Sequence, residues 1–65
     1  MKTLTVYYDA KTMKSITNVI TPVQVVYNVG NHVFIDDEKW KVEHIVIDSM
    51  QGQDRLVQQV FVSKL

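Results

Sequence analysis

The sequence predicts a small all-β domain, and three observations support this: the β-branched residues, the alternating patterns and the turn residues. Twelve Val and five Ile stand against three Leu and one Ala, and five Thr add to the bias. β-branched side chains are restricted at χ1 and fit a pleated sheet better than a helix. Short alternating runs lie between turns rich in Gly, Asn and Asp. We therefore expect a small β-barrel or a strongly curled antiparallel meander of about five to six strands.

The length of 65 residues predicts a single small β domain, residues 1–65. A chain this short buries about 60% of its unfolded surface, so we expect a stability on the order of 3–5 kcal/mol. It has no Cys, and therefore neither a disulfide nor a thiolate zinc site. The first residues lack the apolar run of a secretory signal, and no apolar run is long enough to span a bilayer. We expect a cytoplasmic protein.

Two interpretations are open for the N-terminal third. Residues 4–8 alternate as a half-buried strand, residues 9–12 form a turn, and residues 15–20 resume an extended pattern, which predicts a hairpin. In the alternative, Asp9 caps a helix with Ala10, Met13, Ile16 and Ile20 on one face. Several poor helix formers between residues 12 and 19 favour the hairpin.

Further strands and turns follow Pro22, which lacks a ladder donor and belongs at the start of a strand. We expect strands at residues 23–27 and 32–35, with a turn at 28–31 that contains Gly30 and Asn31, and an acidic turn at 36–39. The strand at 23–27 has little charge and is a candidate edge for dimer pairing.

The longest predicted strand, residues 40–47, changes phase within its length. Trp40 and Val42 share one face, whereas Ile45 and Ile47 continue one residue out of step. Such a change indicates a β-bulge or a sharp bend near Glu43 and His44. A polar loop at residues 49–54 and a last strand at residues 55–63 complete the predicted fold.

Two segments carry a resemblance to known proteins. From Gly30 onward, a Gly turn, a short strand, an acidic turn, a long bent strand and a closing strand resemble an SH3-like barrel. The opening Leu4-Thr5-Val6-Tyr7-Tyr8, followed by Ile16-Thr17-Asn18-Val19, is similar to the start of short uncharacterised all-β proteins of Gram-positive bacteria and their phages. These resemblances imply a barrel-like fold and a bacterial or phage accessory protein, and assign no functional residue.

Metal and cofactor chemistry have little support in the sequence. His32 and His44 could meet on adjacent strands, with Glu43 or Asp48 as a third ligand, but neither His has the spaced partner of a zinc motif. The alternative is that both are ordinary strand residues. The acidic run 36–38 is too compact for a calcium loop and fits a solvated turn. We expect no metal and no cofactor.

Catalysis has no starting point here. Without Cys, the candidate nucleophiles are Ser15, Ser49, Ser63 and the Thr residues, and none lies in a nucleophile-elbow context. Two Gly in the whole chain do not build a phosphate-binding loop. We expect a protein that is not an enzyme.

The aromatic residues are the best candidate binding groups. Tyr7 and Tyr8 face opposite ways, so at least one of them is expected at the surface, and we select Tyr7. Lys39 and Lys41 flank Trp40 and would form a basic-aromatic patch with it, to which Arg55 is a possible addition. The competing interpretation places Trp40 in the core with both lysines solvated.

Several predicted strands are apolar on both faces, whereas a single small sheet buries one. This pattern favours a non-enzymatic module that binds another protein, or a second copy of itself, through exposed aromatics on a sheet. The first alternative is a nucleic-acid-binding barrel that uses Lys39, Trp40, Lys41 and Arg55, although seven basic and seven acidic residues cancel. The second is a structural subunit of a larger assembly.

Overall fold

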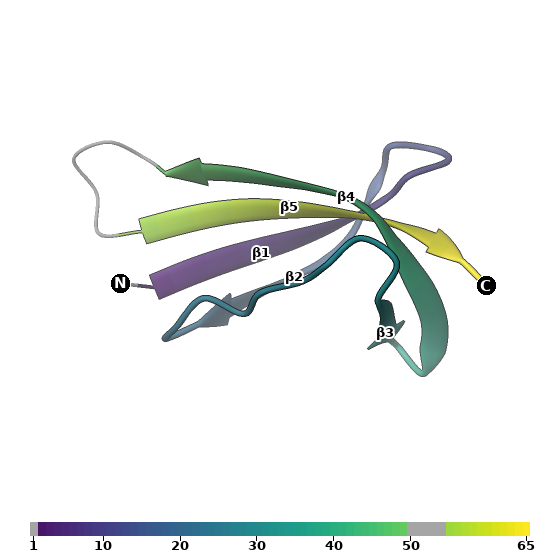
Figure 1. The fold of residues 1–65 in the computed structure, drawn as a ribbon, viewed down its shortest axis with the longest axis horizontal. Coiled ribbons are helices and arrows are strands. Elements are labelled where there is room, and N and C mark those ends of the chain that lie inside the picture. Colours follow the sequence, from purple (N-terminus) through teal and green to yellow (C-terminus); the bar gives the residue numbers. More distant parts are fainter. Residues whose placement is uncertain (1, 50–54) are drawn as a thin grey trace.

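A computed structural model describes residues 2–49 and 55–65 and shows an all-β fold, as predicted (Figure 1). One strongly curled sheet forms a half-barrel with strand order β2-β1-β5-β4-β3. The sheet is mixed, because β1 and β5 are parallel while the other neighbours are antiparallel. In this parallel pair, the first and the last strand of the chain lie next to each other in the interior of the sheet. The strands are β1 (Lys2–Asp9), β2 (Ser15–Thr21), β3 (His32–Ile35), β4 (Glu38–Ser49) and β5 (Arg55–Lys64).

The N-terminal third is the predicted hairpin of β1 and β2, and the helix alternative for residues 9–20 is wrong. The Asp9 carboxylate accepts a hydrogen bond from the Lys11 N–H at 2.9 Å, and the Asp9 N–H donates to the Lys14 carbonyl at 2.9 Å. Asp9 therefore closes a turn instead of capping a helix. Met13 adopts a left-handed φ of 63°, which a continuing helix does not permit.

Residues 22–31, which we call the strap, are not a strand, so the strand predicted at 23–27 is wrong. The strap crosses the concave inner face of the sheet from β2 to β3 (Figure 1). The buried Gln58 amide holds it by donating to the Val25 carbonyl at 3.0 Å. At its end, the Gly30 N–H donates to the Val42 carbonyl at 2.9 Å with Gly30 at a φ of 95°, a conformation that suits glycine. The strap supplies the second layer that one curled sheet lacks.

The β3–β4 hairpin and the bend in β4 follow the prediction, except that β4 begins at Glu38, inside the predicted turn 36–39. Asp36 and Asp37 form the two-residue turn with φ of 51° and 65°, a conformation that Asp tolerates. The register of β4 against β5 shifts between Val42 and His44, which confirms the β-bulge at Glu43. The predicted loop at residues 49–54 lies outside the described residues, except that Ser49 ends β4.

The core lies between the inner face and the strap. Three polar side chains, Thr3, Thr5 and Gln58, are also fully buried there, and the Gln58 amide donates to the Thr5 hydroxyl at 2.8 Å. This bond and the one to the strap satisfy both amide hydrogens, as burial of a polar group requires. The buried apolar residues are Tyr7, Ile35, Trp40, Val42, Val60 and Val62.

Candidate functional site: the outer face of the sheet

Tyr7 and Trp40, the two aromatic candidates from the sequence, are both buried. Their side chains are 8% and 9% exposed, so the expectation of an exposed Tyr7 is wrong, and Trp40 is a core residue. Register explains both placements. Tyr7 pairs with Val60 of β5, and Trp40 pairs with Val33 of β3, so each ring points into the half-barrel. Neither ring is available to a partner at the surface.

The Tyr7 hydroxyl is hydrogen-bonded to the Tyr27 hydroxyl of the strap. The two rings pack edge to face, with centroids 6.0 Å apart and planes at 84°. Burial first, and then the hydrogen bond and charge of Tyr27, raise the pKa of Tyr7 far above its ordinary value. Tyr7 is therefore a structural group that fastens the strap in its neutral form.

The basic candidates do not form one site. Lys39 and Lys41 are exposed and lie on the side of β4 opposite to Trp40. Arg55 begins β5 and pairs in register with Lys2, at the other end of β5 from the residues paired with Lys41. The structure thus brings the two lysines together and leaves Arg55 far away.

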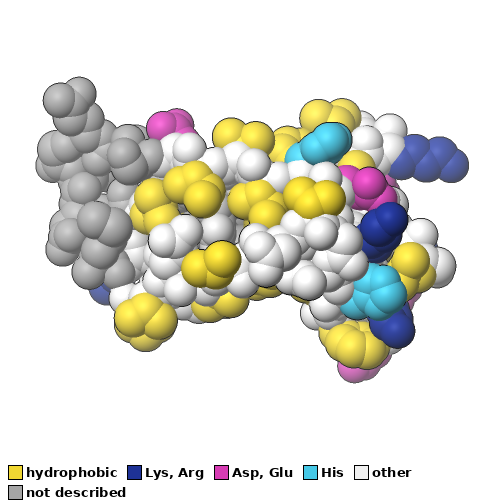
Figure 2. All heavy atoms as spheres, viewed as in Figure 1, with side chains coloured by type: hydrophobic (Ala, Val, Ile, Leu, Met, Phe, Trp, Pro, Cys, Tyr) yellow, Lys and Arg dark blue, Asp and Glu magenta, His cyan; other side chains and the backbone are white. Residues whose placement is uncertain are grey.

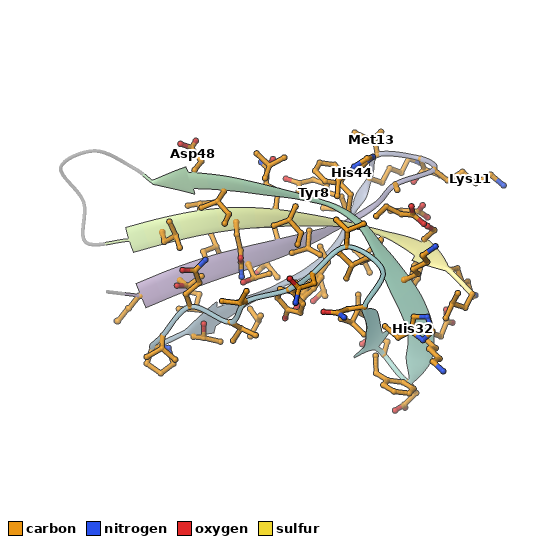
Figure 3. The ribbon with its side chains drawn as sticks, viewed as in Figure 1. Tyr8, Lys11, Met13, His32, His44 and Asp48 are labelled. Carbon is orange, nitrogen blue, oxygen red and sulfur yellow. The ribbon has the colours of Figure 1, made fainter. Side chains whose placement is uncertain are left out.

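The two histidines lie apart. His32 pairs with Lys41 at the edge strand β3, whereas His44 pairs with Phe61 on the outer face (Figure 3). Within residues 2–49 and 55–65, no group of three potential ligands is placed to hold a metal ion.

The outer, convex face of the sheet is open to solvent and yet carries many apolar side chains. Cross-strand registers align it in three rows: Leu4–Val57–Asp48, Val6–Gln59–Val46 and Tyr8–Phe61–His44, each from β1 across β5 to β4. The side chains from β1 and β5 in these rows are half-buried, while Val46 is 48% exposed. No described element lies over these rows, because the strap passes on the opposite side.

The third row holds an aromatic group beside a hollow. The Tyr8 and Phe61 rings stack with centroids 5.2 Å apart and planes at 20°, and the His44 ring meets Phe61 edge to face at 6.4 Å. Next to them, a hollow of about 300 Å³ is lined mainly by apolar atoms. Figures 2 and 3 show its histidine with hydrophobic side chains on both sides. The lining residues are Ala10, Met13, His44, Val46 and Phe61.

Sequence reasoning missed this hollow because its residues come from three separate segments. Alternation did place Tyr8 and Tyr7 on opposite faces, but it does not say which face of β1 is covered. The phase change at Glu43 was the available signal, since it moves His44 and Val46 to the side opposite the core residues of β4.

No family model, no curated protein and no solved structure matches this chain. The part of the chain that the structure describes has no helix long and apolar enough to cross a membrane.

Proposed function

We propose that this chain is a non-enzymatic protein-binding module, and that the outer face with its hollow receives a partner protein. The partner presents one large aliphatic or aromatic side chain, which enters the hollow beside Phe61 and Val46. Tyr8 and the remaining apolar rows contact the flanking residues of the partner. The binding element is thus a sheet surface with aromatics, and its aromatic residues are Tyr8 and Phe61, since Tyr7 and Trp40 are buried.

One observation supports the proposal above the others: β1 turns its more apolar side outward. Thr3 and Thr5 are 1% exposed on the inner face, whereas Leu4 and Val6 lie on the outer face and remain half-buried. A sheet that needed only to fold would place its aliphatic residues inside. Contiguous apolar surface with aromatic residues at its centre is typical of binding hot spots.

The shape of the hollow favours a protein partner over a small molecule or a substrate. A volume of about 300 Å³ is at the lower end of the range for ligand pockets, and this hollow opens on a convex surface. Its lining is almost wholly apolar, and among the described residues that line it, His44 is the one titratable side chain. A side chain anchored to a partner's backbone needs less enclosure than a free ligand, because the rest of the interface holds it in place.

A source and a cellular compartment are also part of the proposal. We propose a bacterial or phage accessory protein that acts in the cytoplasm, and two features support this: the chain has no Cys, and its opening hairpin is similar to short Gram-positive and phage proteins. A second copy of the chain and a larger assembly are the competing partners.

A displayed random-peptide library, selected on the whole protein, tests the proposal. We expect the selected peptides to share one large apolar residue. Their affinity for the Val46→Lys protein should be at least ten-fold lower than for the original protein. This substitution puts a charge beside the hollow at a side chain that is 48% exposed, so the fold survives it. The matched control is Val26→Lys on the strap, where the side chain is 73% exposed and binding should be unchanged.

Two results would reject the proposal. Peptides that bind the Val46→Lys protein as well as the original would place the binding surface elsewhere. A dimer in sedimentation equilibrium that Val46→Lys dissociates would assign the outer face to a second copy instead of a partner.

A further inference from the structure

The β3–β4 hairpin carries a second surface, separate from the outer-face hollow. Its residues are His32 and Phe34 on β3 and Lys39 and Lys41 on β4, which we call the hairpin patch. Phe34 pairs directly with Lys39, and His32 pairs directly with Lys41, so the four side chains share one side of the hairpin. All four are exposed. Figure 2 shows the group at the lower right, where a histidine lies among Lys or Arg side chains beside hydrophobic surface.

Phe34 does not contribute to the core. It is 75% exposed, the highest value among the large hydrophobic side chains of residues 2–49 and 55–65. The opposite side of the same hairpin supplies the core contacts through Val33, Ile35 and Trp40. The Phe34 ring therefore stands in solvent with its faces open.

The two lysines are accessible to an anionic ligand. Within the described parts of the chain, the one ion pair joins Lys64 to Glu38 at 2.8 Å, so neither Lys39 nor Lys41 has an ionic partner. Two of the nearby acids are engaged: Glu43 accepts a hydrogen bond from Ser63 at 2.6 Å, and Glu38 is paired with Lys64. The Asp36–Asp37 turn lies at the tip of the hairpin, between β3 and β4.

We propose that the hairpin patch binds single-stranded nucleic acid, with a base stacked on Phe34 and backbone phosphates on Lys39 and Lys41. Residues two apart on a strand are separated by about 7 Å. The patch therefore presents two rings side by side on β3 and two ammonium groups side by side on β4. A nucleic acid strand repeats a ring and a phosphate in the same way, and aromatic stacking with basic side chains is the common mode of single-strand recognition. An acidic peptide would use the lysines and leave Phe34 without a contact.

Fluorescence anisotropy with a labelled oligothymidylate of about ten nucleotides tests the proposal on the full chain. We expect weak binding. A plot of the logarithm of the binding constant against the logarithm of the salt concentration should have a slope of about −1.4, the value for two phosphate contacts on a single strand. Phe34→Ala should weaken binding about ten-fold or more through lost stacking. The double variant Lys39→Gln with Lys41→Gln should lose most of the salt dependence of oligonucleotide binding.

Matched controls separate the patch from general charge and apolarity. Lys2→Gln with Lys11→Gln removes the same charge at exposed positions away from the hairpin, and Val26→Ala removes an equally exposed apolar group. Both controls should bind like the original protein. All of these positions are exposed, so the unfolding transition, followed by Trp40 fluorescence, should be preserved.

Three results would overturn the proposal: no binding at about 50 mM salt, binding that Phe34→Ala leaves unchanged, or displacement of the oligonucleotide by polyglutamate at equal charge concentration. The last would identify an acidic protein as the ligand. Val46→Lys leaves the hairpin patch intact, so this test and that of the outer face fail independently.

Discussion

The inner and outer faces of the same sheet differ, and in β1 the difference reverses the usual pattern, because threonines are buried while aliphatic residues stay half exposed. Inside, Thr3, Thr5 and Gln58 are buried to within 1% exposure, and outside, Leu4, Val6 and Phe61 stay half open. The difference lies in what covers each face. The strap covers the inner face and provides the Val25 carbonyl as a hydrogen-bond acceptor for Gln58, while nothing in the described chain covers the outer face. In β1, the position of the strap, residues 22–31, therefore determines which side chains are buried, more than their hydrophobicity does.

The first prediction contrasts apolar residues on the two faces and has the largest expected effect. Val60 is fully buried on the inner face, and Val46 is 48% exposed on the outer face. Val60→Ala should lower the free energy of unfolding by about 2 kcal/mol, through lost burial and a residual cavity. Val46→Ala should lower it by less than about 0.5 kcal/mol. Urea denaturation of both variants measures the contrast, and equal losses would show that the outer face is covered.

The second prediction concerns the polar contact between the inner face and the strap. Gln58→Leu removes both amide bonds and leaves the Thr5 hydroxyl and the Val25 carbonyl without this donor. We expect a loss of about 1–2 kcal/mol in unfolding free energy, with faster hydrogen exchange in the strap. Gln59→Leu is the control, because Gln59 lies half-buried on the outer face of the same strand. A more stable Gln58→Leu protein would contradict the role given to this side chain.

The third prediction uses pH to release the strap. The pKa of Tyr7 is raised in the folded state by burial and by Tyr27, so its neutral form is favoured by folding. Its contribution is fully present below the ordinary tyrosine pKa of about 10 and is lost as the pH rises above that value. We expect the unfolding free energy to fall above pH 10, and to fall less steeply in Tyr7→Phe. A parallel pH dependence in the two proteins, measured by urea denaturation, would remove Tyr7 as the cause.

The fourth prediction has the smallest effect on stability. Phe34→Ala should change the unfolding free energy by less than about 0.5 kcal/mol, because the ring is 75% exposed. Thermal melts should therefore nearly coincide, in contrast to the loss of oligonucleotide binding expected for the same variant. A loss of 2 kcal/mol or more would mean that the ring packs in solution.

Local features of the fold were predictable because they depend on neighbouring residues. β-branched content predicted the all-β class, Asp36 and Asp37 predicted a tight turn, and the change of phase predicted the bulge at Glu43. The same holds for the β1–β2 hairpin, whose turn is closed by the Asp9 side chain.

Features that depend on distant segments were not predictable. Residues 23–27 have a strand-like pattern, yet an extended strap produces the same pattern when its partners are side chains such as Gln58. The parallel pairing of β1 with β5 joins residues about 53 positions apart and leaves no local trace. The exposure of Tyr7 was therefore mispredicted, and the hollow at Phe61 was missed.

Site-specific photocrosslinking tests the central claim, that the outer face is the binding surface, most directly. A benzophenone amino acid replaces Val46 in one protein and Val26 in another, and each is irradiated with a peptide selected on the original protein. We expect crosslinking from position 46 at the edge of the hollow, and none from position 26 on the strap. Crosslinking from position 26 alone would contradict the account and would move the binding surface to the strap side of the molecule.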